Sequence, residues 1–407
     1  MYRRLLLLAL GSFAIGTDSF VIAGVLPEVS RGLHVGIGAA GQLVTAYALP
    51  FALLAPVLAA LTARWPRRTV LLAGMGAFVV GNLATALLPT FGLVLAARAI
   101  TGVGAAMYAP AGAGVAVALA PPERRGRALA VVVAGMTSAT ALGSPLGTAL
   151  ASVATWRLTM AAVAALGLVA GLGVLALPAV PAPQAISLRA RLAPVRDRRV
   201  ALTLATTLLA FAGPFAVYSY LAVTFDRATG GSGTTLAVLM FAWGVAATLG
   251  NLGAGALADR YGSRRVLNIG LAVAVVDFAA LPITSAQLVT AVPALVVWGV
   301  AVWSLVVAQQ HRLVSGVPTA APLLVALNQT AVYLAVSASG VVGAAAIAVL
   351  GGHRIGLVGA VLLAAALVVG ELAHRAGRAD YSARVRATSR RYASRSSSGS
   401  SAPPVAR

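Results

Sequence analysis

The sequence predicts an all-α integral membrane protein with twelve transmembrane helices in two pseudo-symmetric six-helix halves. Hydrophobic residues make up 60% of the 407 residues and charged residues only 10%, a balance that a soluble domain of this size cannot carry on its surface. The chain offers about twelve apolar runs of about 20 residues, the length that crosses a bilayer. A basic turn at 255–265 has a related copy at 59–68, which indicates an internal duplication.

The apolar runs place the spans at 5–26, 39–61, 70–88, 92–119, 128–151, 158–177, 200–224, 233–257, 266–284, 287–309, 323–349 and 355–373. The first run exceeds about 20 residues and lacks a small-residue cleavage end, so we expect an uncleaved span and not a signal peptide. An N-terminal half at 1–177 and a C-terminal half at 200–373 are joined by a Pro-rich, then Arg-rich cytoplasmic linker at 178–199. The Arg- and Ser-rich tail at 374–407 is predicted to be disordered and to lie along anionic lipid of the inner leaflet.

Arginine positions predict the orientation. All 30 basic residues are arginines, and they give a formal net charge of +21. With the N-terminus inside, the inner segments hold 25 of them and the outer loops only four: Arg31, Arg157, Arg227 and Arg354. The positive-inside rule therefore predicts that both termini are cytoplasmic. Because these arginines lie in short turns and not on a soluble face, we expect no nucleic-acid partner.

Composition also argues against several other classes. Without cysteine the chain has no disulfide, no thiol catalysis and no cysteine metal site. The four histidines are scattered near span ends, and no Ser/His/Asp set meets at one depth. A phosphate-binding Gly-x-x-x-x-Gly-Lys-Ser/Thr loop is missing, which argues against an ATP-driven pump. We therefore expect no enzyme activity, no cofactor and no metal.

Three ionisable side chains fall inside predicted spans: Asp18, Arg98 and Asp277. Such groups cost about 3 kcal/mol each on insertion scales and are usually functional. Asp18 and Arg98 lie at similar depth, about 9–12 Å below the outer boundary at about 1.5 Å per residue. Asp277 lies in the middle of a span, and we expect it to be paired or protonated, with a structural role favoured over a functional one.

The two basic turns differ in chemistry. The second carries Gly255, Asp259, Arg260, Gly262 and Arg264, and its carboxylate suits the positive N-terminus of the following helix. We expect the glycine at its start to let the turn pack closely. The first copy keeps only its arginines, Arg64, Arg67 and Arg68, with alanine where the second copy has its acid. A charge-based latch is therefore predicted for the second copy, whereas the first is explained by topology alone.

The span at 128–151 carries small residues four apart, Gly135, Ala139, Gly143 and Gly147, which form a ridge that lets another helix approach closely. Pro145 removes one backbone hydrogen bond there and is expected to bend the helix. One interpretation is a sealing surface that rocks against the second half. The other is ordinary close packing.

The candidate substrate-binding residues are aromatic and amide side chains of the spans. A largely apolar, aromatic cavity with a few polar groups suits amphipathic small molecules. The amide of Asn328 needs a partner in the membrane. The candidates are Phe20, Tyr47, Phe51, Tyr108, Phe215, Tyr218, Trp243, Trp298, Trp303, Asn328 and Tyr333.

Six spans, a basic linker and six spans, with the turn at 255–265, resemble the major facilitator superfamily. The closer resemblance is to the bacterial twelve-span drug:H⁺ antiporters, in the arabinose, chloramphenicol and purine efflux branch. The segments that carry it are Gly16-Thr-Asp18-Ser-Phe20 through Pro27, Gly41-Gln-Leu-Val-Thr-Ala-Tyr47, Arg124-Arg-Gly-Arg-Ala128, Gly143-Ser-Pro145-Leu-Gly147, and Trp298-Gly with Gln309-Gln310.

This resemblance implies a monomeric secondary transporter of the bacterial plasma membrane that works by alternating access. Helices 1 and 4 of the superfamily face the central cavity, so Asp18 and Arg98 would meet there. The pair would form in one state and give way to a protonated Asp18 in another, which predicts proton-coupled efflux of small amphipathic drugs or metabolites. The alternative is a static pair that only joins the two helices. In the resembling proteins the acid of the basic turn helps to lock the inner face.

Two other functions stay open at this stage. The first is a proton-coupled uptake symporter for a sugar, nucleoside or similar nutrient, which would accumulate its substrate inside intact cells. The second is a non-transporting membrane sensor or scaffold, which would lose its function when the arginine-rich tail is removed.

Overall fold

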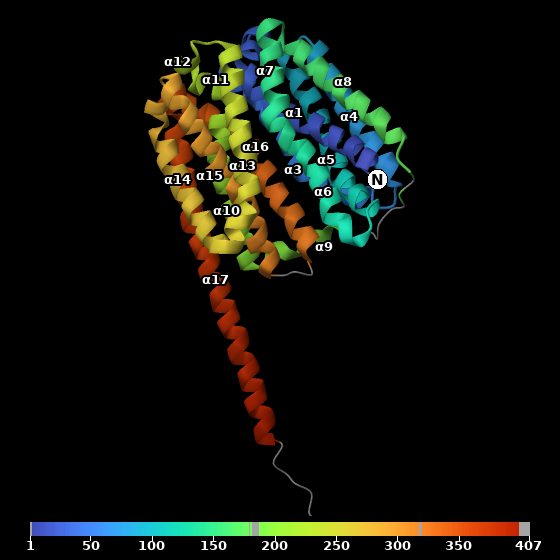
Figure 1. Cartoon of the computed structure of the whole chain (residues 1–407), viewed down its shortest axis with the longest axis vertical. Helices are drawn as coiled ribbons and strands as arrows, with labels where there is room; N and C mark the ends of the chain where they lie inside the picture. Colours follow the sequence, from blue (N-terminus) through green and yellow to red (C-terminus); the bar gives the residue numbers. More distant parts are fainter. Residues whose placement is uncertain (1, 179, 181–186, 317–319, 399–407) are drawn as a thin grey trace, which may run out of the picture.

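The computed structural model describes residues 2–178, 180, 187–316 and 320–398, and these residues form helices and turns without any β-strand. Twelve of the helical segments are long and apolar enough to cross a membrane. Figure 1 shows the first-half helices, blue to green, beside the second-half helices, yellow to red. The predicted fold class is confirmed.

The first half consists of six spans. They are formed by α1 (Tyr2–Gly32), by α2 (Ile37–Ala40) with α3 (Gln42–Leu61), by α4 (Arg67–Leu87), by α5 (Phe91–Ala118), by α6 (Arg125–Ser138) with α7 (Ser144–Val153), and by α8 (Trp156–Leu175). A linker with the short helix α9 (Leu188–Leu192) follows.

The second half begins with α10 (Arg198–Ser219) and the short helices α11 (Leu221–Thr224) and α12 (Asp226–Thr229). The remaining spans are α13 (Gly233–Tyr261), α14 (Ser263–Thr284), α15 (Leu288–Gly316), α16 (Ala321–Leu350) and α17 (Ile355–Ser398). We call the end of the bundle with the turns around Arg64, Arg124 and Gly262 the basic end. The other end, with the turns around Gly36, Gly230 and Gly351, is the opposite end.

The two halves touch along two seams, α3 with α16 and α7 with α13, and α1 also contacts α10, α11 and α13. In the first seam, between α3 and α16, the Thr45 hydroxyl donates to the Ser337 carbonyl at 2.8 Å and the Gln42 amide to the Gly340 carbonyl at 3.2 Å. In the second, between α7 and α13, the Ser152 and Thr234 hydroxyls lie 3.3 Å apart. All of these groups lie in the segments nearest the opposite end.

Glycines of α13 show that the second seam does not reach the basic end. A Cβ at Gly244 would lie 2.6 Å from the Ala141 Cα, so only glycine allows this approach. Gly255 lies three turns further along the same face, since 11 residues at about 100° each return to within about 20°. A Cβ at Gly255 would meet no atom within 4 Å. The close packing expected at Gly255 is therefore wrong for this conformation, because the halves are apart here.

The ridge of small residues packs inside the first half. Its members meet α1: Gly135 lies against Ala9, Ala139 against Gly16, Gly143 against Thr17 and Gly147 against Val21. The predicted sealing surface against the second half is therefore wrong for this ridge, and close packing is the correct interpretation. The neighbouring face, with Thr140, Ala141 and Ser152, contacts α13 instead.

Pro145 perturbs its span through a π-helical turn. Residues Ala139–Gly143 form this turn between α6 and α7, and Pro145 follows at the start of α7. A wider turn leaves room for the proline ring, which would otherwise clash with the carbonyl four residues earlier. The expected local distortion is present, and it lies just before Pro145.

Two boundaries in the structure differ from those expected. The span expected at 200–224 ends as α10 at Ser219, and the chain continues through α11 and α12. The tail expected to be disordered from residue 374 instead continues α17 as a helix to Ser398, extending beyond the basic end (Figure 1). Alanine and arginine are strong helix formers and carry the helix on past the apolar run. The rest of the predicted tail, 399–407, lies outside the described residues.

Candidate functional site

A fully buried ion pair lies between α1 and α5. The Arg98 Nη1 donates to both carboxylate oxygens of Asp18, at 2.7 and 2.9 Å. The exposed fractions are 0% for Asp18 and 1% for Arg98. Gly102 lets α5 lie directly against the Tyr47 backbone of α3, because a side chain at this position would collide with the Tyr47 carbonyl. The structure therefore brings together the two residues that were predicted to lie at one depth.

Tyr47 covers this ion pair. Its ring centroid lies 4.7 Å from the Arg98 Cζ, a cation–π arrangement. The Tyr47 hydroxyl lies 2.9 Å from that of Ser19, the residue after Asp18. Ser19 is half-buried whereas Tyr47 is buried, so the tyrosine separates the charges from the more accessible serine.

Not every polar atom around the pair has a partner. Among the described residues, the Arg98 Nε and the Asn82 Oδ1 are buried without a hydrogen bond. Arg98 thus uses one nitrogen for Asp18 and keeps donor capacity. A buried polar group without a partner is unfavourable.

Four of the aromatic candidates form two contacts where the halves meet. Phe51 of α3 and Tyr333 of α16 stack with ring centroids 3.7 Å apart. Phe20 of α1 contacts Tyr218 of α10 edge to face at 5.6 Å. The Tyr218 hydroxyl also donates to the Phe20 carbonyl at 3.3 Å. These contacts join the two halves and would change if the halves moved relative to each other.

Three other candidates are buried within one half. Tyr108 donates to the Leu8 carbonyl at 3.2 Å and so joins α5 to α1. Trp298 packs behind Trp243 and against Phe278, with ring centroids 5.8 and 4.9 Å away. Asn328 accepts from the Thr207 hydroxyl at 2.8 Å. All three side chains are enclosed by their own half in this conformation, and their roles as substrate contacts stay predictions.

The second basic turn is a single residue. Gly262 joins α13 to α14 with φ of 83°, a conformation that favours glycine. Arg264 bonds the Glu371 carboxylate of α17 at 3.0 and 2.5 Å, and the Asn268 amide donates to the same group at 2.6 Å. Asp259 and Arg260 are exposed. Within the described chain no ion pair involves Asp259.

The first basic turn has no comparable carboxylate contact among the described residues. Arg64 is exposed, and Arg67 and Arg68 are half-buried at the start of α4. The Arg67 backbone N–H donates to the Val180 carbonyl of the linker at 3.2 Å. This turn therefore meets the linker, and the topological role of its arginines stays a prediction.

Sequence reasoning missed a polar network in the second half. The Gln309 amide donates to the Thr203 carbonyl and the Thr207 hydroxyl, both at 3.1 Å, and Arg312 donates to the Gln309 side chain at 3.2 Å. Asn328 completes it through Thr207. The amides were visible in the sequence, but a threonine inside a span gives no signal of its own.

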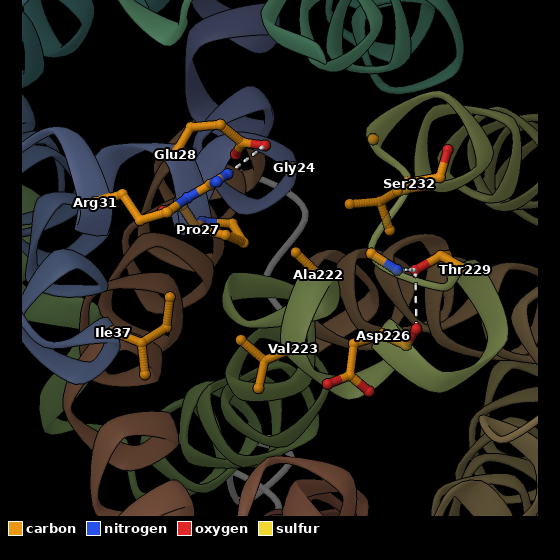
Figure 2. Close-up of a pocket in the computed structure, with 13 residues that line it drawn as sticks. Gly24, Pro27, Glu28, Arg31, Ile37, Ala222, Val223, Asp226, Thr229 and Ser232 are labelled. Atoms are coloured by element: carbon orange, nitrogen blue, oxygen red, sulfur yellow. Dashed lines mark hydrogen bonds and ion pairs between the residues drawn. The ribbon is translucent and has the colours of Figure 1, made fainter.

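A pocket of about 330 Å³ opens at the opposite end, between α1 and the short helices α11 and α12 (Figure 2). Glu28 and Arg31 pair across one wall at 3.7 Å. Asp226 lies in another wall and is 2.6 Å from the His353 Nε2. The lining of α1 starts at Gly24, beyond the buried ion pair, and no predicted site residue belongs to it.

Asp277 stands apart from both sites. It is half-buried on α14, and its Oδ2 has no hydrogen-bond partner in the described part of the chain. The expected partner on a neighbouring helix is therefore not present. A carboxyl so placed provides a natural comparison for Asp18.

Twelve candidate membrane spans in two halves that meet at one end, with a buried acid–arginine pair in the first half, are the architecture of a membrane transporter. The chain belongs to the Major Facilitator Superfamily, whose family model matches residues 8–340. It is thus a multi-pass secondary transporter of small molecules.

Relatives fit this assignment. The chain is 30% identical over 341 residues to the uncharacterised MFS-type transporter YbcL of Bacillus subtilis, covering 84% of this chain and 87% of the relative. It is 34% identical over 261 residues to a chloramphenicol resistance protein of Streptomyces lividans, covering 63% and 67%. The predicted resemblance to the drug-efflux branch agrees with these relatives.

Solved structures confirm the fold. The nucleoside transporter NupG aligns with a TM-score of 0.74 at 13% identity, over 92% of this chain and 99% of that one. The xylose transporter XylE of Escherichia coli, in a partially occluded inward-open conformation, aligns with a TM-score of 0.67 at 15% identity, over 90% and 96%.

Proposed function

We propose that this transporter exports small amphipathic molecules in exchange for protons, with Asp18 and Arg98 as the coupling pair. The observation that carries the proposal is the complete burial of this pair, with both carboxylate oxygens held by one guanidinium nitrogen. An unpaired charge at this depth costs about 3 kcal/mol, so both members stay charged only while they stay together. Protonation of Asp18 removes one charge and frees Arg98 to move.

The surroundings of the pair support coupling over a purely static link. A purely static pair is best satisfied with partners on the buried polar atoms around it, yet Arg98 Nε and Asn82 Oδ1 have none among the described residues. A second arrangement of α1 and α5 that satisfies these atoms would alternate with the present one. Proton binding would then bias the two arrangements, as a coupled exchanger requires.

Alternating access supplies the transport step. The halves are joined at the opposite end and apart around Gly255. If the arginine-rich turns face the cytoplasm, as the positive-inside rule predicts, this conformation faces inward. In the other conformation Asp259, which is exposed and without an ion pair in the described chain, would meet the arginine-rich start of α6 and hold the basic end shut.

Export is favoured over uptake by the named relatives. The Streptomyces lividans relative is a chloramphenicol resistance protein, and another, 32% identical over 248 residues, is a chloramphenicol efflux pump of Mycobacterium tuberculosis. NupG and XylE, at 13% and 15% identity, support the fold alone. Uptake is therefore an outcome of the test and not a second proposal.

The test is transport by everted membrane vesicles that are energised to an acidic lumen. A panel of drugs and metabolites would be offered from outside, with and without an uncoupler. We expect uncoupler-sensitive accumulation of at least one amphipathic compound in the vesicles, which corresponds to export from the cell. Accumulation only in right-side-out cells would favour a symporter, and flux that ignores the uncoupler would contradict proton coupling.

A further inference from the structure

Four aromatic rings of the second half surround one ring of the first half. Phe215, Tyr218, Trp243 and Trp303, which we call the aromatic box, have ring centroids 6.2, 5.6, 6.3 and 6.2 Å from that of Phe20. The box comes from α10, α13 and α15, and Phe20 comes from α1. These separations are those of favourable ring–ring contacts.

The box is occupied only because the halves are joined at the opposite end. Every wall belongs to one half and the enclosed ring belongs to the other. If the halves separate there during transport, α1 carries Phe20 away and the box loses its occupant. Burial of such rings is a large part of the stability of any interface, so an empty aromatic site would favour a replacement of similar shape.

The box also holds a hydrogen-bond donor that Phe20 does not use. Trp243 is only 2% exposed, and its Nε1 has no hydrogen-bond partner in the described chain. A second donor, the Tyr218 hydroxyl, bonds the Phe20 carbonyl and lies 3.3 Å from the Ser144 hydroxyl. Both of these partners belong to the first half. When it withdraws, both donors of the box are without these partners, and no charged side chain belongs to the box.

We propose that the aromatic box binds the ring of the transported molecule, and that Phe20 occupies the same place in the conformation described here. The ligand is a neutral molecule with one benzene-sized ring and an oxygen acceptor for Trp243 or Tyr218. In export the ring enters the box when the opposite end opens and leaves on that side, and Phe20 refills the box as that end closes. This inference rests on the proposed transport function, since it assumes that the halves separate.

The test measures binding to purified full-length protein without any proton gradient. The probes are chloramphenicol, 4-nitrobenzyl alcohol and 4-hydroxyacetophenone, each a neutral ring with an oxygen acceptor. Phe20→Ala empties the box, so at least one probe should bind about three- to tenfold more tightly than to the wild type. Phe51→Ala is the control, because it removes a first-half ring that stacks on Tyr333, outside the box.

A second measurement separates the donor from the walls. In Phe20→Ala, the further change Trp243→Phe keeps a ring but removes the N–H, and it should cancel most of the gain. The indole N–H signals of the five tryptophans provide a direct readout, in which the probe should shift the Trp243 signal. If no probe binds more tightly to Phe20→Ala, or if Phe51→Ala gives the same gain, the proposal is overturned.

A cross-link between the halves tests whether Phe20→Ala changes binding by altering the conformation instead of emptying the box. Ser152→Cys with Thr234→Cys joins the halves at the opposite end, where the two hydroxyls are 3.3 Å apart. In the cross-linked protein the gain in binding should remain, and its loss would contradict a vacant box. Because binding is measured without a gradient, failure of proton-coupled export would leave this result unaffected, and the two proposals fail separately.

Discussion

At the scale of single residues, Asp18 and Arg98 make each other's burial tolerable. Removing one partner of a buried pair typically costs about 3–5 kcal/mol, because the other charge is left uncompensated. Tyr47 adds a ring over the guanidinium and keeps the pair away from the half-buried Ser19. The charges are therefore stable in this arrangement, and protonation of Asp18 is the least costly way to separate them.

Substitutions of Tyr47 should distinguish its ring from its hydroxyl. Tyr47→Phe loses only the hydroxyl contact with Ser19, and we expect transport to fall by no more than about tenfold, the effect of one hydrogen bond. Tyr47→Ala also loses the ring over Arg98 and should transport less than Tyr47→Phe. Initial rates in everted vesicles measure both. Equal losses would show that the ring contributes nothing.

The Asp18–Arg98 pairing was predictable because depth in a helix follows from counting residues. Helix rotation does not follow so simply, so the sequence did not show that Tyr108, Trp298 and Asn328 are enclosed by their own half. Each residue turns a side chain by about 100°, and an apolar span shows little contrast between its faces. An aromatic or amide side chain therefore looks alike in the sequence whether it faces the interface or its own half.

At the scale of elements, the span of α6 and α7 has two working faces. The ridge with Gly135 and Gly143 fixes it to α1, and the adjacent face with Thr140 and Ser152 meets α13. The π-helical turn Ala139–Gly143 lies between α6 and α7, and its Thr140 is one of the residues that contact α13. The four-residue spacing revealed the ridge but not which helix packs on it, because small residues allow any neighbouring helix to approach closely.

An engineered disulfide tests the seam between α7 and α13. The chain has no cysteine, so Ser152→Cys with Thr234→Cys yields one defined cross-link. We expect it to form readily and to reduce transport at least about tenfold, because the opposite end can no longer open. A reducing agent should restore transport. Full activity of the cross-linked protein would show that this seam need not separate.

At the scale of the whole molecule, the twelve spans and the duplication followed from apolar length and the repeated turn. The conformation could not be predicted in this way, because the same sequence must form both conformations of a transporter. Only contacts such as Thr45 with Ser337, set against the open space at Gly255, show which end is closed. The helical continuation to Ser398 was missed because composition suggested disorder while local helix propensity prevailed.

Orientation can be tested with two matched serines at opposite ends. Ser232→Cys lies beside the turn at Gly230 and Gly231, and Ser263→Cys follows Gly262 at the basic end. The positive-inside rule predicts that a membrane-impermeant maleimide added to intact cells labels the first variant and not the second. Permeabilised cells should label both. The reverse pattern would place the arginine-rich turns outside.

The central claim is that Asp18 couples protons to transport. Its most direct test compares Asp18→Asn with Asp277→Asn in proteoliposomes, using the same acid-to-amide change on the interface side and on the peripheral helix α14. Proton-driven accumulation and substrate counterflow would be measured in parallel, since counterflow needs a folded protein but no gradient. We predict that Asp18→Asn loses driven accumulation and keeps counterflow, whereas Asp277→Asn keeps both. Undiminished driven accumulation in Asp18→Asn would contradict the claim.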